Sequence, residues 1–240
     1  MILIVLASGR GTRLGNLTIN SPKCLVKINR KPIISYTRKI FNKFEKVFII
    51  TGYQQEKIKN YLKDHGNCKF FFNKKFKTTN MVESMFVPFS DVNKDIIVVY
   101  SDIIFDPTII DDLRKQIDSS VTINSEWLKY WKKRMKMKDI LNDAENLVLK
   151  NGKIKTIGTI IKGTLPKYQF MGIVKIKLLD YKKLFKAYKE HEDKNIDLTN
   201  FLNHSINKKN IDIRYLKTNK FWVEVDNKKD VDLVKKLLKK

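Results

Sequence analysis

The chain has 240 residues, 42% of them hydrophobic, and a formal net charge of +24 at pH 7. This length and composition predict a substantial core in a single domain spanning 1–240, with two domains as the alternative. No apolar run approaches the ~18 residues of a membrane span, and Met1–Ala7 lacks a basic leader, so we expect a first strand there and no signal peptide. Cys24 and Cys68 form no CxxC pair, which suggests a reducing cytoplasm and no metal site at cysteine.

The strong positive charge raises the possibility of a nucleic-acid-binding protein. However, only seven of the 49 basic residues are arginine, the preferred residue for bidentate phosphate and base contacts. The lysines are scattered and form no aromatic-basic motif, so we expect no specific nucleic-acid partner. The charge should still speed the capture of anionic substrates.

The first half of the chain alternates strand and helix patterns. Strands are predicted at 1–7, 47–51, 70–72 and 96–100, the last being a central parallel strand. Four helices are predicted between and after them, over 32–44, around 58–62, over 82–89 and from Pro107 to Ile117, with Asp106 as a cap. This order predicts an α/β sheet with helices on both faces.

The second half is richer in strands. A hairpin is predicted over 148–157, with its turn at Asn151-Gly152. Further strands are expected at 168–176, 211–216 and 221–225, and an amphipathic helix follows. The basic run Lys129–Lys138 is poorly patterned and is interpreted as a loop, either a mobile lid or a solvated segment.

The stretch that follows the first strand is the most informative. Gly9 and Gly11 form a turn whose backbone N–H groups would face one point, with Arg13 directly after it and Pro22-Lys23 further on. The dinucleotide pattern G-x-G-x-x-G fails because Leu14 holds its third place, and no P-loop pattern is present. A phosphate-binding loop is therefore favoured, and an ordinary β-turn beside solvated cations is the alternative.

Two carboxylates follow predicted strands. Ser101-Asp102 ends the strand 96–100, and Asp226 ends the strand 221–225, with Glu224 just before it. Ligands of open α/β sheets bind beyond the carboxyl ends of strands, and two converging carboxylates suit Mg²⁺. The alternative for each aspartate alone is a helix N-cap.

Taken together, the motifs resemble those of nucleotidyltransferases, in the branch similar to phosphocholine and phosphoglutamine cytidylyltransferases. The resemblance covers nearly the whole chain and rests on LASGRGTRL, SPKCLV, KTTNMVESM, YSDIIF, SEWLKYWKKRM with NDAENL, IDLTNFL and FWVEVDNKKDV. One departure is Ser8, where alanine is commoner. The resemblance implies a Rossmann-like three-layer α/β/α fold with a mixed, mostly parallel sheet and a β-rich acceptor-side insertion. It divides the domain into 1–120 for nucleotide, 121–220 for acceptor, and 221–240 for a metal-ligand strand and closing helix.

The implied reaction is attack by an acceptor phosphate on the α-phosphorus of CTP, which gives a CDP-linked product and pyrophosphate. The resemblance assigns Arg13 and Lys23 to the phosphates and Asp102 and Asp226 to Mg²⁺. Asn80 is the candidate for reading the cytosine edge, since an amide both donates and accepts, and a helix N-cap is its alternative. The expected nucleotide-binding residues are Leu6, Ala7, Ser8, Gly9, Gly11, Thr12, Arg13, Lys23, Thr79, Asn80 and Ser101.

The acceptor pocket is assigned to six residues: Trp127, Trp131, Arg134, Asp143, Glu145 and Tyr168. The two tryptophans are four apart, so they would share a helix face, as pocket wall or as core. The identity of the acceptor stays open. So does the oligomeric state, which is either a monomer or a homodimer. The alternatives are a sugar-1-phosphate nucleotidyltransferase using UTP, dTTP or GTP, and a basic nucleic-acid-binding protein. A role in capsule or surface-polysaccharide synthesis is suggested only by the resemblance.

Overall fold

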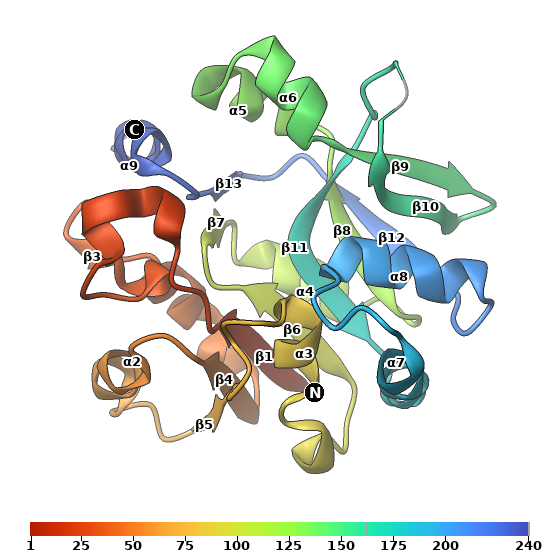
Figure 1. Cartoon of the computed structure of the whole chain (residues 1–240), viewed down its shortest axis with the longest axis horizontal. Helices are drawn as coiled ribbons and strands as arrows, with labels where there is room; N and C mark the ends of the chain where they lie inside the picture. Colours follow the sequence, from red (N-terminus) through yellow and green to blue (C-terminus); the bar gives the residue numbers. More distant parts are fainter. Residues whose placement is uncertain (162, 240) are drawn as a thin grey trace.

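A seven-stranded mixed sheet forms the centre of the molecule in a computed structural model, which describes residues 1–161 and 163–239 (Figure 1). The strand order is β12-β8-β11-β6-β1-β4-β5, and the pairs are parallel except for the two that β11 makes. The sheet strands are β1 (Ile2–Ala7), β4 (Lys46–Thr51), β5 (Cys68–Phe72), β6 (Ile96–Tyr100), β8 (Ser120–Asn124), β11 (Gln169–Ile176) and β12 (Arg214–Thr218). The predicted mixed, mostly parallel sheet is confirmed.

Three short two-stranded pairings accompany this sheet. They join β2 (Lys27–Ile28) with β3 (Lys31–Pro32), β7 (Ile103–Phe105) with β13 (Trp222–Glu224), and β9 (Glu145–Lys150) with β10 (Lys153–Ile160). The β9–β10 pair is the predicted hairpin. Asn151 and Gly152 both have positive φ in its turn, as a type I′ hairpin requires.

Helices cover both faces of the sheet. They are α1 (Ile34–Thr37), α2 (Gln55–Leu62), α3 (Met81–Phe86), α4 (Thr108–Arg114), α5 (Trp127–Arg134), α6 (Met137–Asp143), α7 (Leu178–Glu190), α8 (Leu198–Asn207) and α9 (Lys228–Leu237). Short 3-10 helices span Thr12–Thr18, Lys23–Leu25, Arg38–Lys43 and Phe89–Asp91. None of the helices in the described ranges is long and apolar enough to cross a bilayer.

The core divides into two layers because side chains alternate along each strand. In β1, Leu3 and Val5 face one apolar cluster, whereas Ile2 and Ile4 face the other. All six residues of β1 are buried, as expected for a parallel strand covered on both faces. This arrangement is the predicted three-layer α/β/α architecture.

Several local predictions were wrong. The run Lys129–Lys138, interpreted as a loop, lies mostly in α5 and α6, because Tyr130, Trp131, Arg134 and Ile140 form buried faces there. Pro32 lies in β3 instead of opening a helix, and the segment 34–43 is half 3-10 helix. Ile117, predicted as the last residue of a helix, lies beyond the end of α4 and is 83% exposed.

Candidate active site

The backbone of the glycine turn packs closely against the side chain of Lys23. Gly11 has φ of 74°, and a Cβ built on it would lie 2.8 Å from Cβ of Lys23. A side chain at this position would therefore strain the backbone and push Lys23 away. The hydroxyl of Thr18 donates to the carbonyl oxygen of Gly11 at 2.9 Å, and this hydrogen bond stabilises the turn.

Lys23, Asp102 and Asp226 meet at the end of this turn. Nζ of Lys23 lies 2.6 Å from Oδ2 of Asp102 and 2.6 Å from Oδ1 of Asp226. The two aspartates are neighbours because β13 pairs with β7 and the N–H of Val225 donates to the carbonyl oxygen of Asp102 at 3.0 Å. Arg13, whose side chain is 67% exposed, reaches the same Oδ1 of Asp226 at 3.2 Å. Three segments distant in sequence thus place cations and carboxylates at one point.

The electrostatics of this cluster favour its charged forms. Burial would lower the pKa of Lys23, but Asp102 and Asp226 together raise it above its ordinary value. Burial would likewise raise the pKa of Asp226, yet the charge and hydrogen bond of Lys23, with Arg13 and Arg134, lower it to about 2. Both groups are therefore ionised at neutral pH.

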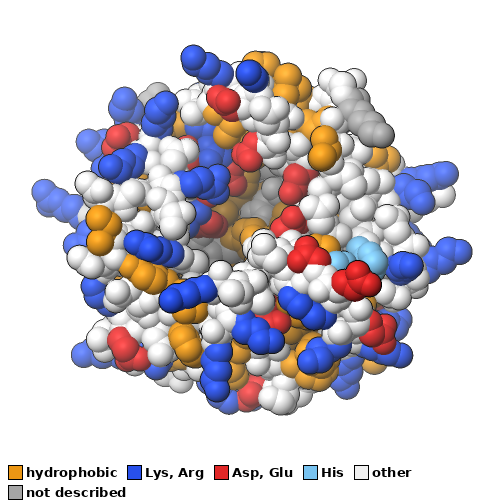
Figure 2. Space-filling view, in the orientation of Figure 1, with side chains coloured by type: hydrophobic (Ala, Val, Ile, Leu, Met, Phe, Trp, Pro, Cys, Tyr) orange, Lys and Arg blue, Asp and Glu red, His pale blue; other side chains and the backbone are white. Residues whose placement is uncertain are grey.

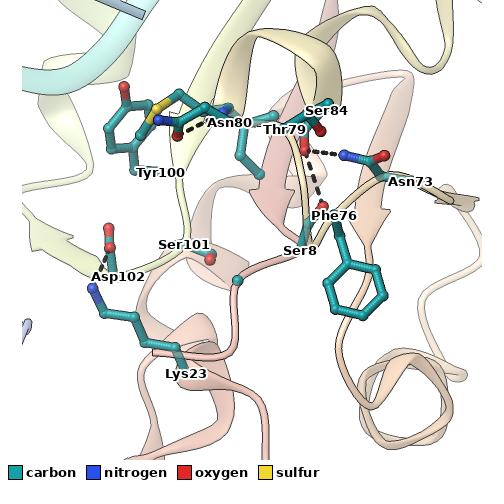
Figure 3. A pocket seen from close by; sticks show the side chains of 13 residues that line it. Ser8, Lys23, Asn73, Phe76, Thr79, Asn80, Ser84, Tyr100, Ser101 and Asp102 are labelled. Carbon is teal, nitrogen blue, oxygen red and sulfur yellow. Dashed lines mark hydrogen bonds and ion pairs between the residues drawn. The ribbon is translucent and has the colours of Figure 1, made fainter. Parts of the chain in front are cut away.

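A first cavity opens beside Lys23, between the glycine turn and α3 (Figure 3). It is lined by Leu6, Ser8, Gly9, Lys23, Asn73, Phe76, Thr79, Asn80, Met81, Ser84, Tyr100, Ser101 and Asp102. Eight of these were singled out from the sequence as nucleotide or metal residues. Ala7 is buried in β1, and Gly11, Thr12 and Arg13 lie in the adjoining turn.

A buried hydroxyl chain holds one wall of the first cavity. The amide of Asn73 donates to Oγ of Ser84 at 3.0 Å, and Ser84 donates to Oγ of Ser8 at 3.2 Å (Figure 3). Ser8 in turn donates to the carbonyl oxygen of Ile50. Ser8, the one departure from the commoner alanine, is thus a member of a satisfied network. This chain ties the start of the glycine turn to α3 and β4.

Asn80 caps α3, as its structural interpretation predicted. Its Oδ1 accepts from the N–H of Met81 at 2.9 Å, and its Nδ2 donates to the carbonyl oxygen of Asn195 at 3.2 Å. The side chain also lines the first cavity, so the cap and a ligand contact are compatible.

A second cavity lies on the other side of Met81 and Tyr100, which line both. Five carboxylates contribute to its wall: Asp143, Glu145, Asp197, Glu224 and Asp226. Figure 2 shows a hollow in the middle of this face with acidic side chains around it, while lysines and arginines are spread over the outer surface. An acidic hollow in a chain of net charge +24 favours a ligand group that donates hydrogen bonds or carries positive charge.

Two features of the second cavity bear on its ligand. Burial raises the pKa of Glu145 to about 7, although Oγ1 of Thr199 lies 2.9 Å from its Oε1. Nε1 of Trp131 is buried and finds no hydrogen-bond partner among the described residues. The cavity therefore offers a titratable carboxyl group, whereas the buried indole nitrogen of Trp131 is not exposed to it.

The six predicted acceptor residues divide into two groups. Trp131, Asp143 and Glu145 line the second cavity. Trp127 lies in the core with its ring edge-on to Trp131 at 5.1 Å, because its helix face points inward. Tyr168 lines neither cavity and lies under the ammonium of Lys217. Arg134 is buried, held by Glu224, Asp226 and Asp230, and borders a neighbouring basic groove.

Some residues at these cavities were not singled out from the sequence. Asp197 precedes α8 in the stretch IDLTNFL, where its side chain caps the helix by accepting from the N–H of Asn200, and it also lines the second cavity. Gly172 interrupts β11 with φ of 72°, and a Cβ there would lie 2.9 Å from the ring of Tyr100. A glycine inside an apolar strand could have signalled a close approach.

The donor set at the junction fits a divalent cation. Oxygens of Asp102 and Asp226 both contact one nitrogen atom, so they converge on a point small enough for an ion. Mg²⁺ binds through one or two carboxylates plus waters and substrate phosphates, and does not need an all-protein cage. The described residues contain no group of three or more acidic, histidine or cysteine side chains that could hold a metal ion.

Comparisons with known proteins identify a family and several relatives of this chain. A family model described as MobA-like NTP transferase domain matches residues 3–132. A CTP:phosphoglutamine cytidylyltransferase from Campylobacter jejuni is 27% identical over 97% of this chain and 98% of its own. A choline-phosphate cytidylyltransferase from Streptococcus pneumoniae is 29% identical over 60% of this chain and 65% of its own. The solved inositol-1-phosphate CTP transferase from T. maritima has the same fold, with a TM-score of 0.79 at 20% identity over 99% of this chain and 94% of its own.

Proposed function

Because the chain belongs to the family of MobA-like NTP transferase domains, we propose that it transfers CMP from CTP to the phosphate of a small phospho-acceptor. The products are a CDP-linked compound and pyrophosphate. The choice of CTP is supported by the two cytidylyltransferases that resemble this chain in sequence. The acceptor is of the phosphoglutamine or phosphocholine type.

The main support is the position of Lys23, Asp102 and Asp226 where the two cavities meet. Lys23 and Asp102 line the first cavity, and Asp226 lines the second. Nucleotide in the first cavity and acceptor in the second would therefore meet beside a lysine and two carboxylates. Phosphoryl chemistry needs mainly such positioning and neutralisation of charge.

Each residue has a distinct part in this proposal. Lys23 contacts the α-phosphate and the acceptor phosphate as a compact charge, and Arg13 holds the β- and γ-phosphates through its fork of donors. Asp102 and Asp226 would hold Mg²⁺, which supplies charge neutralisation at the phosphates when bound. Ser8, Gly9 and Asn80 contact the nucleotide from the first cavity.

The acidic lining of the second cavity supports an acceptor with an amine, ammonium or amide group. Asp143, Glu145 and Asp197 are placed to accept hydrogen bonds from it. We expect the reaction to take place in the cytoplasm, where CTP is made. We expect the protein to be a monomer or a homodimer.

The alternative is a sugar-1-phosphate nucleotidyltransferase using UTP, dTTP or GTP, since the matched family model does not specify the nucleotide. A nucleic-acid-binding protein is disfavoured, because the matched family model is that of an NTP transferase and only seven of the 49 basic residues are arginine.

Pyrophosphate release tests the proposal. Each of the four NTPs is incubated with Mg²⁺ and with phosphoglutamine, phosphocholine or glucose 1-phosphate. Release only with CTP and a non-sugar acceptor is the expected result and names the acceptor. Release with a sugar phosphate and another nucleotide would move the protein to the alternative. No release in any combination, with no thermal stabilisation by CTP, would refute the proposed activity.

A further inference from the structure

Arg134 holds three carboxylates at the base of the candidate metal site. Its side chain is 2% exposed; Nε lies 3.0 Å from Oδ1 of Asp230, and Nη2 lies 2.8 Å from Oδ2 of Asp230 and 3.0 Å from Oδ2 of Asp226. Nη1 contacts Glu224. All three nitrogen atoms of this guanidinium are therefore engaged by carboxylates.

The two oxygens of Asp226 are used for different purposes. Oδ1 faces the junction of the cavities, where it accepts from Lys23 and Arg13, whereas Oδ2 faces Arg134. A carboxylate with one oxygen fixed from behind has little freedom to rotate. Arg134 thus determines which oxygen Asp226 presents to a cation.

Asp230 holds Asp226 through a hydrogen bond from the Asp226 backbone. It is fully buried, and its Oδ2 accepts from the N–H groups of Asp226 at 2.8 Å and of Asn227 at 3.1 Å. Asp230 also forms a capping box with Asn227 at the start of α9. Backbone and side chain of Asp226 are therefore held by one connected pair, Arg134 and Asp230.

We propose that Arg134 and Asp230 are positioning residues that orient Asp226 for divalent-cation binding. This inference rests on the proposed function, because it takes Asp226 as a metal ligand. Hydrogen-bond partners behind a ligand commonly control its affinity for the metal. It gives Arg134 a place behind the metal carboxylate, whereas the sequence analysis assigned this residue to the acceptor pocket.

Geometry and charge must be separated in the test. Removing the positive charge of Arg134 would by itself make the site more negative and favour a cation, whereas losing the fork would misplace Asp226. Arg134→Lys keeps the charge but cannot reach three carboxylates with one nitrogen atom. It therefore isolates the effect of geometry.

The measurement is Mn²⁺ binding, followed by the electron paramagnetic resonance of free Mn²⁺, with and without CTP and without acceptor. We expect Arg134→Lys to weaken Mn²⁺ binding by ~10- to 100-fold and to lower kcat more than it changes KM for CTP. Asp230→Asn should act in the same direction, and it keeps the test open if Arg134→Lys does not fold. The double variant should be less than additive, because both act through Asp226.

Lys175→Arg is the matched control, since it also exchanges one buried cation for another. Nζ of Lys175 contacts the carbonyl oxygens of Arg114 and Gln116, and Lys175 lines neither cavity. It should leave Mn²⁺ binding unchanged. If Arg134→Lys and Asp230→Asn lowered only thermal stability and bound Mn²⁺ as the parent does, the positioning role would be refuted.

Mn²⁺ binding and pyrophosphate release by the parent protein distinguish a failure of this inference from a failure of the proposed function. Saturable Mn²⁺ binding that Asp226→Asn abolishes, without pyrophosphate release from any substrate pair, would end the proposed activity and leave the positioning role intact. Absence of such binding, or binding indifferent to Asp226→Asn, would overturn the positioning role.

Discussion

Nζ of Lys23 lies 2.6 Å from Oδ1 of Asp226, although 203 positions separate the two residues in the chain. The same nitrogen is shared equally with Asp102, so one ammonium group neutralises two carboxylates. A divalent cation between these carboxylates would repel the ammonium group. We therefore expect metal binding to release Lys23 toward a phosphate of the nucleotide.

Lys23→Ala should lower kcat by about 10²- to 10³-fold, because the charge that neutralises the transferred phosphoryl group is lost. The pyrophosphate assay at saturating CTP and Mg²⁺ measures this directly. The control is Lys31→Ala, which removes a lysine from an exposed position in β3. A Lys23→Ala protein with the turnover of the parent would remove this residue from the reaction.

Glu145 should make the protein less stable as the pH rises. Its pKa is raised by burial from 4.5 to about 7, so between these values the folded protein keeps a proton that the unfolded chain has lost. The favourable contribution is thus complete below about pH 4.5 and is lost as the pH rises through about 7.

Glu145→Gln removes this titration and leaves an oxygen to accept from Thr199. Its Tm should therefore exceed that of the parent by more at about pH 8 than at about pH 4. Glu192→Gln, at an exposed position, supplies the control for exchanging one acidic side chain for an amide. A Tm difference for Glu145→Gln that does not vary with pH would contradict the burial argument.

Gly172→Ala tests the wall between the two cavities. The new Cβ would meet the Tyr100 ring at 2.9 Å and would also force alanine into left-handed backbone. We expect a loss of about 1–3 kcal/mol in unfolding free energy and a higher KM for both substrates.

Gly163→Ala separates the two causes of the loss at Gly172. Gly163 also has a positive φ, of 89°, but no described atom lies within 4 Å of a Cβ built on it. This control should show only the backbone strain and no change in KM. Equal effects of the two substitutions, measured by urea unfolding and initial rates, would show that contact with Tyr100 is unimportant.

Ser84→Ala should destabilise the protein by about 1–3 kcal/mol, because it leaves the buried amide of Asn73 without its acceptor. Ser90→Ala, at an exposed serine, should change unfolding free energy by less than about 0.5 kcal/mol. Urea denaturation of the two variants measures the difference. A cost at Ser84 no larger than that at Ser90 would mean that solvent satisfies Asn73.

The strand-end carboxylates could be predicted because periodicity and topology fix them. A run such as Ile96–Tyr100 predicts a buried strand, and parallel strands end at one edge, so Asp102 was expected near the phosphate loop. Asp226 reaches that edge through the short β7–β13 pairing, whose antiparallel register no periodicity reveals. The sequence nevertheless placed Asp226 at the end of a predicted strand, and the resemblance to a known family added its assignment to Mg²⁺.

Arg134 and Asp230 could not be predicted in their observed positions. The sequence analysis assigned Arg134 to the acceptor pocket and gave Asp230 no role, because a charged residue in a surface helix such as α5 or α9 normally marks the solvent face. Their burial depends on the packing of α5 against α9, which depends in turn on the whole fold. The error over Lys129–Lys138 has the same origin, since the apolar faces of α5 and α6 become evident only with their partners.

Met81 and Tyr100 form one partition between the first and second cavities. Two substrates in separate chambers that meet at Lys23 must be present together, so initial-rate lines for the proposed reaction should intersect instead of running parallel. No enzyme-bound intermediate would carry the nucleotide. A phosphorus atom that passes directly from the leaving oxygen to the entering one would emerge with its stereochemical configuration inverted.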